Sequence, residues 1–254
     1  MDKRNDNDNK ILRPVLHIPT DIEGKVIERP NRFLAIVELE LDGVRKHEKV
    51  HVHDPGRLTD LIYPGNRVLL RKADNTKSKN KSKIRKTGWD MIAGRIADDW
   101  ILINSAFHRK ISCWAIENGI IDFLSNIESI LPEQKYGSSR LDYLLEKQGR
   151  KIWVEVKGCT LAEDGVATFP DAPTIRGKRH LEELIHVVDQ GDEAAVIMLI
   201  FRPEARCFTP NCKIDPDFSE TMLKASQKGV RIFPLQFSFK ENSIYYVSEI
   251  PLCF

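Results

Sequence analysis

The sequence predicts two domains, a small N-terminal β-barrel followed by an α/β domain. Two patterns predict this fold class. Short apolar segments separated by turn residues precede residue 72, whereas strand-like and helix-like segments alternate beyond residue 86. A basic polar segment separates the two patterns. We therefore place a polar tail at 1–12, the barrel at 13–83 and the α/β domain at 84–254.

The expected barrel strands are short and closely spaced. Apolar residues alternate with other side chains over 33–41, and Asp42-Gly43 supplies a turn before the next strand-like run at 50–53. Pro-Gly pairs mark the later turns, and a further strand is expected around 68–70. Closely spaced strands with little helix are typical of a compact barrel of the OB kind.

The second domain is predicted from helices that alternate with strands. A helix is expected near 112–121, and apolar residues recur at helical spacing over 174–189. The continuous apolar run at 194–201 is typical of a strand buried on both faces. Asp215-Pro216 marks the start of another helix, and a strand resumes at 230–237. Strand, helix and strand in this order indicate a parallel crossover.

The candidate site starts from the segment IWVEVKG at 152–158. In a strand, Glu155 and Lys157 share one face, and an isolated pair of this kind is commonly a solvated charge pair. The preceding segment indicates a hairpin. If Gln148-Gly149 forms its turn, Asp142 lies opposite Glu155; a four-residue loop preserves this register and a three-residue loop shifts it by one.

Two carboxylates on facing strand positions repel each other, so something must compensate them. Mg²⁺ is commonly held by one or two carboxylates together with water and substrate phosphate, and Mn²⁺ is an alternative. Asp142 and Glu155 are therefore candidate metal ligands. Lys157 could stabilise negative charge on an attacking hydroxide or on a phosphoryl group.

These residues resemble the PD-(D/E)xK motif of restriction-endonuclease-like nucleases. Longer segments carry a more specific resemblance, to the sugar fermentation stimulation protein family. It extends from about residue 15 to about residue 235 and rests on the strings NRFLAIVELELDG, PGRLTDLIYPGNRVLL, YGSSRLDYLLE, WVEVKGCTLAEDGVATFPDAPTIRGKRHLEEL and DPDFSETMLKASQKGV.

The resemblance implies an OB-like barrel, a restriction-endonuclease-like α/β domain and DNA binding with little sequence preference. By position, it implies that Asp142 and Glu155 hold the metal and that Lys157 is the catalytic lysine. It also points to a second group with active-site or phosphate-binding roles, unless these residues only begin and solvate a helix: Asp171, Arg176, Lys178 and His180.

The basic segment at 71–86 has eight Lys or Arg residues against one Asp, in a chain whose net charge is only +2. Such a segment is commonly a solvated loop, but its charge density also suits neutralisation of nucleic-acid phosphates. The candidate DNA-binding side chains in it are Lys77, Lys79, Lys81, Lys83, Arg85 and Lys86.

The cysteines indicate neither a disulfide framework nor a structural zinc site, because their number is odd and no C-x-x-C pair occurs. We expect ordinary thiols at Cys113, Cys159, Cys207, Cys212 and Cys253. No apolar run approaches the roughly 20 residues of a membrane span, and the N-terminus is polar. The sequence therefore predicts a cytoplasmic protein without a membrane partner, and leaves open whether it forms a homo-oligomer.

The leading hypothesis is a DNA-binding protein that hydrolyses phosphodiester bonds with Mg²⁺. The alternative is a non-catalytic DNA-binding or regulatory protein linked to sugar metabolism, in which the same carboxylates bind metal or satisfy local structure. A carbohydrate enzyme with Asp142 and Glu155 as its acid and base is disfavoured. Facing positions are too close for an inverting pair, and no aromatic-rich sugar platform is evident.

Overall fold

The N-terminal domain is a closed five-stranded barrel. A computed structural model describes residues 12–74 and 86–254. The barrel strands are β2 (Ile22–Asn31), β3 (Leu34–Leu41), β4 (Val44–His51), β5 (Arg67–Lys72) and β6 (Trp89–Ile96). They pair in the order β4-β3-β2-β5-β6, and β6 also pairs in parallel with β4, which closes the barrel. The expected OB-like barrel is confirmed, and its closing strand lies beyond residue 83.

The second domain contains a mixed sheet that continues from the barrel. From β6 the order runs through β7 (Asp99–Leu102), β15 (Arg231–Lys240), β13 (Glu193–Ile200), β10 (Arg150–Cys159), β9 (Ser139–Lys147) and β8 (Ser129–Tyr136). The first strand, β1 (Arg13–His17), pairs with β16 (Ser243–Glu249), which pairs with β15. A separate sheet consists of β11 (Leu161–Glu163), β12 (Val166–Phe169) and β14 (Cys207–Pro210).

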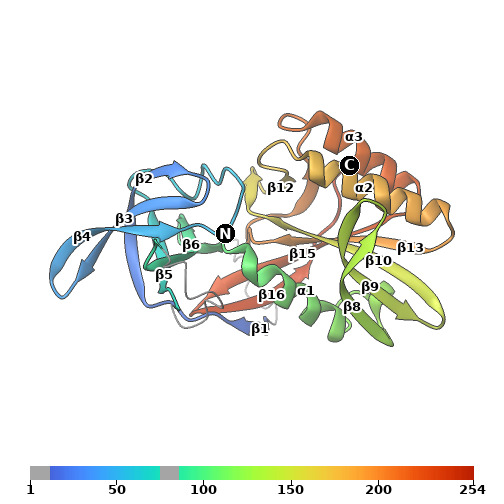
Figure 1. The fold of residues 1–254 in the computed structure, drawn as a ribbon, viewed down its shortest axis with the longest axis horizontal. Helices are drawn as coiled ribbons and strands as arrows, with labels where there is room; N and C mark the ends of the chain where they lie inside the picture. Colours follow the sequence, from blue (N-terminus) through green and yellow to red (C-terminus); the bar gives the residue numbers. More distant parts are fainter. Residues whose placement is uncertain (1–11, 75–85) are drawn as a thin grey trace, which may run out of the picture.

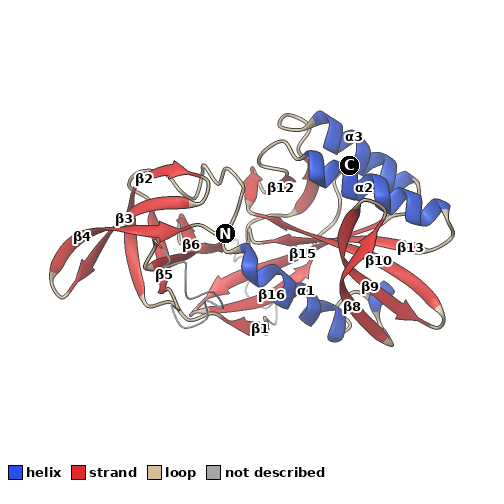
Figure 2. Cartoon of the chain, in the orientation of Figure 1, coloured by secondary structure: helices blue, strands red, loops and turns tan. Residues whose placement is uncertain are grey.

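Helices cover both faces of the mixed sheet (Figures 1 and 2). The α-helices are α1 (His108–Glu117), α2 (Ile175–Asp189) and α3 (Pro216–Gln227), and the 3-10 helices are η2 (Ser105–Phe107) and η3 (Asp122–Leu124). Helices α2 and α3 pack together on one face, and α1 lies on the other. The helix predicted at 112–121 is α1, which begins four residues earlier than predicted, at His108, and ends at Glu117.

Strand β13 is buried on both faces, as the apolar run at 194–201 predicts. Ala195, Ile197 and Leu199 belong to the core beneath α1, whereas the alternate residues belong to the core beneath α2 and α3. The strand pairs in parallel with β10 on one side and with β15 on the other. The crossovers through α2 and α3 therefore place β10, which carries the candidate site, beside the most buried strand.

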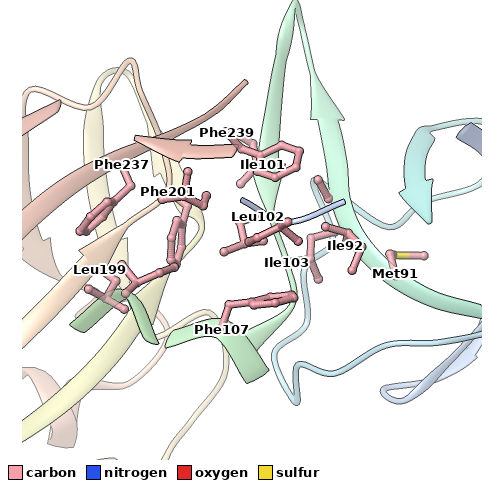
Figure 3. Packing of buried hydrophobic residues seen from close by; sticks show 14 of the residues in the cluster. Met91, Ile92, Ile101, Leu102, Ile103, Phe107, Leu199, Phe201, Phe237 and Phe239 are labelled. Atoms are coloured by element: carbon pink, nitrogen blue, oxygen red, sulfur yellow. The ribbon is translucent and has the colours of Figure 1, made fainter. Parts of the chain in front are cut away.

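The barrel and the second domain share one hydrophobic core. Met91 and Ile92 of β6 lie in the same cluster as Phe201, Phe237 and other residues of the second domain (Figure 3). No exposed linker separates these groups, because β7 pairs with both β6 and β15. The barrel is therefore fixed against the domain that carries the candidate site.

The expectation that all five cysteines are thiols is wrong for two of them. Cys207 and Cys253 form a disulfide across 46 residues of sequence. The backbone amide of Cys253 donates to the carbonyl oxygen of Phe208, so the C-terminal segment lies beside β14. Neither cysteine belongs to a short spacing motif, and only this tertiary pairing brings them together.

Within the described ranges, no helix has the length and apolar character needed to cross a membrane.

Side chains that precede α2 and α3 cap the starts of these helices. Thr174 caps α2 by accepting a hydrogen bond from the Gly177 amide, and Asp215 caps α3 by accepting one from the Phe218 amide. The second carboxylate oxygen of Asp215 accepts from the Thr174 amide at 2.7 Å. One side chain therefore fixes the starts of both helices.

We expect Asp215→Ala to lower the free energy of unfolding by about 2 kcal/mol, because a helix cap and a second buried hydrogen bond each contribute about 1 kcal/mol. Urea denaturation followed by circular dichroism measures the change. The matched control is Asp217→Ala, which removes an exposed ion pair with Lys178 and an acidic side chain from the first turn of α3, and should cost about 1 kcal/mol or less. Equal losses in the two variants would contradict the double role of Asp215.

Candidate functional site

The β9–β10 hairpin has the predicted turn and register. Gln148 and Gly149 both have positive φ, at 51° and 73°, as a two-residue hairpin turn requires. Paired positions run from Lys147 and Arg150 to Tyr143 and Val154. Beyond this pair the strands separate. There, the Asp142 carboxylate accepts a hydrogen bond from the Val156 amide at 2.7 Å. This amide of β10 is therefore satisfied by a side chain of β9 and not by its backbone.

Asp142, Glu155 and Lys157 line one cleft of about 680 Å³. Its opposite wall includes Arg32 and Asp54 of the barrel domain, so the cleft lies between the two domains. The cleft is large enough for a ligand of drug size, and its lining mixes acidic, basic and apolar side chains. The fold therefore brings the three residues of the predicted motif to a shared, accessible hollow.

Glu155 is the most constrained of these residues, with only 3% of its surface exposed. Its Oε1 accepts hydrogen bonds from Lys157 Nζ, at 2.5 Å, and from His180 Nδ1. Its Oε2 is buried and has no hydrogen-bond partner among the described residues. Burial alone would raise the pKa of Glu155, but the charge of Lys157 and the hydrogen bond from His180 outweigh it and leave that pKa below its usual value.

His180 is positioned by a third side chain. Arg176 Nε donates to His180 Nε2 at 3.3 Å, and because arginine stays protonated, that imidazole nitrogen must be the acceptor. The hydrogen of a neutral His180 then lies on Nδ1, where it is donated to Glu155. The hydrogen-bond pattern therefore assigns a relay from Arg176 through His180 that orients an ionised Glu155.

The carboxyl group of Asp142 is in a less favourable environment. Burial and the nearby charge of Glu155 raise the pKa of Asp142 to about 6, although the Val156 amide and Lys157 act in the opposite direction. Two carboxylates next to the cleft are thus only partly compensated by protein groups. This is an electrostatic environment that a bound cation would stabilise.

The second predicted group is divided by the structure. Asp171 lies on the cleft, and its Oδ2 accepts from the Leu58 amide of the barrel domain at 3.0 Å, so it links the domains and does not cap α2. Arg176 also lines the cleft, and His180 contacts Glu155. Lys178 is not part of the cleft lining, because its Nζ forms an ion pair with Asp217 on α3 at 3.0 Å.

Most of the predicted DNA-binding lysines lie outside the described residues. These are Lys77, Lys79, Lys81 and Lys83, together with Arg85. Lys86 is described and is exposed. The role of this segment therefore stays a prediction.

His108 lines the cleft beside Gly158 and was not among the residues predicted from the sequence. A Cβ atom at Gly158 would lie 2.1 Å from His108 Cε1, so the glycine makes room for the imidazole. The ring stacks on Phe201, and burial lowers the pKa of His108 to about 4, which keeps it neutral at neutral pH. Its Nε2 has no hydrogen-bond partner in the described structure. No spacing pattern connects residues 108 and 158.

The described residues contain no group of three or more His, Cys, Asp or Glu side chains arranged to hold a metal ion. At the cleft, Asp142 and Glu155 supply two carboxylates. A cation there would need water, substrate or backbone oxygens to complete its coordination, which is the usual situation for Mg²⁺.

Family models match both domains of the chain. A model described as the sugar fermentation stimulation protein RE domain matches residues 106–243, and one described as the SfsA N-terminal OB domain matches residues 27–103. The chain belongs to the sugar fermentation stimulation protein family. The resemblance identified from the sequence is thereby confirmed, and the matched ranges correspond to the barrel with β7 and to the α/β domain.

Relatives and a solved structure extend over nearly the whole chain. A sugar fermentation stimulation protein homolog of Methanococcoides burtonii is 52% identical over 241 residues, which cover 94% of this chain and 95% of the relative. A homolog from Methanothermobacter thermautotrophicus is 42% identical over 217 residues, which cover 85% of this chain and 86% of the relative. The structure of Pyrococcus furiosus SfsA in complex with Ca²⁺ matches with a TM-score of 0.84 at 26% identity, covering 95% of this chain and 99% of that one.

The raised pKa of Asp142 predicts a dependence of stability on pH. Since the folded-state pKa of about 6 exceeds the value of about 3.9 in an unfolded chain, the stabilising contribution is present below about pH 4 and is lost as pH rises through about 6. In EDTA at pH 7.5, we expect Asp142→Asn to raise the free energy of unfolding by about 3 kcal/mol. This gain should disappear near pH 4.

Urea denaturation at the two pH values measures this effect. Asp98→Asn is the control, because Asp98 is exposed and pairs only with Arg95, and should change stability by less than about 1 kcal/mol at either pH. A pH-independent effect of Asp142→Asn would show that ionisation of this carboxyl does not oppose folding.

Proposed function

We propose that this protein binds DNA with little sequence preference and hydrolyses phosphodiester bonds with Mg²⁺, or with Mn²⁺ in its place. The observation that carries the proposal is the buried Glu155 carboxylate, whose Oε2 lacks a hydrogen-bond partner among the described residues. It lines the same cleft as Asp142 and Lys157. Their shared position at the cleft supports the resemblance of these residues to the PD-(D/E)xK motif.

The residues fit a divalent cation. Glu155 is held ionised, and Asp142 becomes ionised above about pH 6 at a position where its charge is poorly compensated. Such a pair of hard oxygen ligands suits Mg²⁺ or Mn²⁺. The Pyrococcus furiosus relative was solved in complex with Ca²⁺, another divalent cation with oxygen ligands, which supports the same chemistry here.

Each side chain of the motif has a separate task in this proposal. A divalent cation, when bound, lowers the pKa of water and polarises the phosphoryl group. Lys157 places a positive charge beside Glu155, where it stabilises the negative charge that develops on the phosphate. His180 is a positioning residue: it fixes the orientation of Glu155 through one oxygen and leaves the other free.

The interdomain cleft suits a nucleic-acid strand. Its walls come from both domains, and Arg32, Arg109 and Arg176 supply cationic side chains along them. OB-like barrels commonly bind single-stranded nucleic acid, although the fold alone does not establish this function. The basic segment that contains Lys77 to Lys83 is a further proposed contact for phosphates.

One observation favours the non-catalytic alternative. Lys157 already forms an ion pair with Glu155 at 2.5 Å, so protein groups compensate much of this charge without a metal. A DNA-binding or regulatory protein could use the same contacts for structure alone. Cleavage assays distinguish the two functions.

We expect the purified protein to cleave DNA in Mg²⁺ or Mn²⁺ and to leave it intact in EDTA. Single-stranded and double-stranded DNA are assayed in parallel. Glu155→Gln should lower the rate at least about 100-fold, because it removes a charge that acts at the reacting centre. The control, Glu163→Gln, changes an exposed residue of β11 and should retain the wild-type rate. DNA binding without cleavage by the wild-type protein would select the non-catalytic alternative.

We also expect Mg²⁺ or Mn²⁺ to raise the melting temperature of the protein by mass action. At a metal concentration 100 times the Kd, the stabilisation is about 2.7 kcal/mol. Asp142→Asn should abolish the rise because it removes one of the two carboxylates, whereas Asp98→Asn should preserve it. Differential scanning calorimetry with a metal titration measures both. An equal rise in the wild-type protein and Asp142→Asn would place the metal elsewhere.

A further inference from the structure

A second, smaller hollow of about 360 Å³ adjoins the candidate site. It lies between the β8–β9 hairpin and the start of α2, elements that pack against each other (Figure 1). Six of its lining residues define what we call the basic pocket: Lys135, Arg140, Arg176, Arg179, Ser139 and His180. Four of these side chains are cationic, and none of the lining residues is acidic.

Two of the cations are exposed residues of facing strands in one hairpin. Lys135 of β8 and Arg140 of β9 occupy directly paired positions of the hairpin. Like charges at such positions destabilise a sheet, because their Cβ atoms are about 5 Å apart. In the described part of the chain, neither side chain forms an ion pair with an acidic residue. The nearby Glu183 accepts a hydrogen bond from Ser138 at the hairpin turn instead.

The two arginines on α2 are each held at one nitrogen. Arg179 Nε donates to the hydroxyl of Ser139 at 3.0 Å, and Ser139 is itself buried. Arg176 Nε donates to His180 Nε2 at 3.3 Å. The structure shows no hydrogen bond from the terminal guanidinium nitrogens of either residue to a described group. Oriented guanidinium groups with free terminal nitrogens match the geometry of a phosphate.

The basic pocket is connected to the catalytic cleft through shared residues. Arg176 lines both hollows, and His180 lines the basic pocket while its other nitrogen contacts Glu155. A group bound in the basic pocket is therefore separated from Glu155 by one side chain. A strand whose scissile phosphate lies at Glu155 would place another of its phosphates within reach of this pocket.

We propose that the basic pocket binds a phosphate group of a nucleic-acid strand next to the one that is cleaved. This inference rests on the proposed function, because it takes the strand in the cleft as the source of the phosphate. The anion offsets the repulsion between Lys135 and Arg140, and Arg176 and Arg179 donate to its oxygens. Its charge also stabilises the orientation of Arg176 and, through His180, that of Glu155.

The test uses the double variant Lys135→Gln/Arg140→Gln, which removes two charges and keeps a polar, unbranched side chain at each position. Binding of a labelled single-stranded oligonucleotide is measured by fluorescence anisotropy in EDTA, over a range of salt concentrations. Loss of one phosphate contact should reduce the slope of log affinity against log salt by about 0.7, and weaken binding about fivefold at 0.1 M salt. The matched control, Lys213→Gln/Lys224→Gln, removes two exposed charges near α3 and should bind as the wild-type protein does.

Circular dichroism and urea denaturation of the double variant check that it is folded, and relief of repulsion should leave it at least as stable as the wild-type protein. A 5′-phosphorylated oligonucleotide and its 5′-hydroxyl twin distinguish the source of the phosphate. If both strands lose affinity equally in the variant, an internal phosphodiester occupies the pocket. If only the phosphorylated strand does so, the pocket holds a terminal phosphate. Unchanged affinity and salt slope for both strands would overturn the proposal.

The proposal and the proposed function can fail separately. If the wild-type protein cleaves DNA and the double variant binds it with unchanged affinity and salt slope, the function stands and the phosphate pocket is wrong. If the double variant binds more weakly but the wild-type protein never cleaves, the pocket stands and the catalytic function is wrong. A wild-type protein that binds neither oligonucleotide would overturn the pocket as a nucleic-acid site.

Discussion

Burial of strand β13 on both faces is the constraint on which the arrangement of the site depends. Because its side chains are apolar on both sides, helices must cover both faces of the sheet, and the strand must lie between two parallel neighbours. One of those neighbours is β10. Its apolar half continues the core, and its charged half, with Glu155 and Lys157, reaches the hollow between the domains. The shared core with the barrel fixes the opposite wall of this hollow.

A carboxylate buried in such a position is costly unless it is compensated. Glu155 is compensated by an ammonium group, an imidazole and, one step further away, a guanidinium group. All of these contacts converge on one of its oxygens, which leaves the other without a partner among the described residues. In the proposed function, the oxygen without a partner is the one available to a cation. In the basic pocket the charges without compensating protein groups are positive. The ligand proposed there is therefore an anion.

Local chemistry made several parts of the fold predictable. The turn at Gln148-Gly149 was predicted because Gly149 stands among polar residues between two apolar runs, and that turn determined the register of the hairpin. The cap at Asp215 and the apolar run of β13 are also properties of short segments. The predicted pairing of Asp142 with Glu155 is not formed, because the ladder ends at Tyr143 and Val154 and Asp142 accepts a hydrogen bond from the Val156 amide. The hairpin turn and the first turn of α3 involve residues that are close in sequence, and the apolar run is a property of one segment, so periodicity and turn chemistry carry the information.

The order of the barrel and the α/β domain, the hairpin and the two carboxylates were all predictable from the sequence. Three long-range contacts were not: His180 with Glu155, His108 with Gly158, and the disulfide between Cys207 and Cys253. These contacts join residues 25 to 50 positions apart. These contacts form only after helices and strands have packed together. The periodicity of apolar residues and the chemistry of turns describe single segments, so they do not predict which distant residues meet.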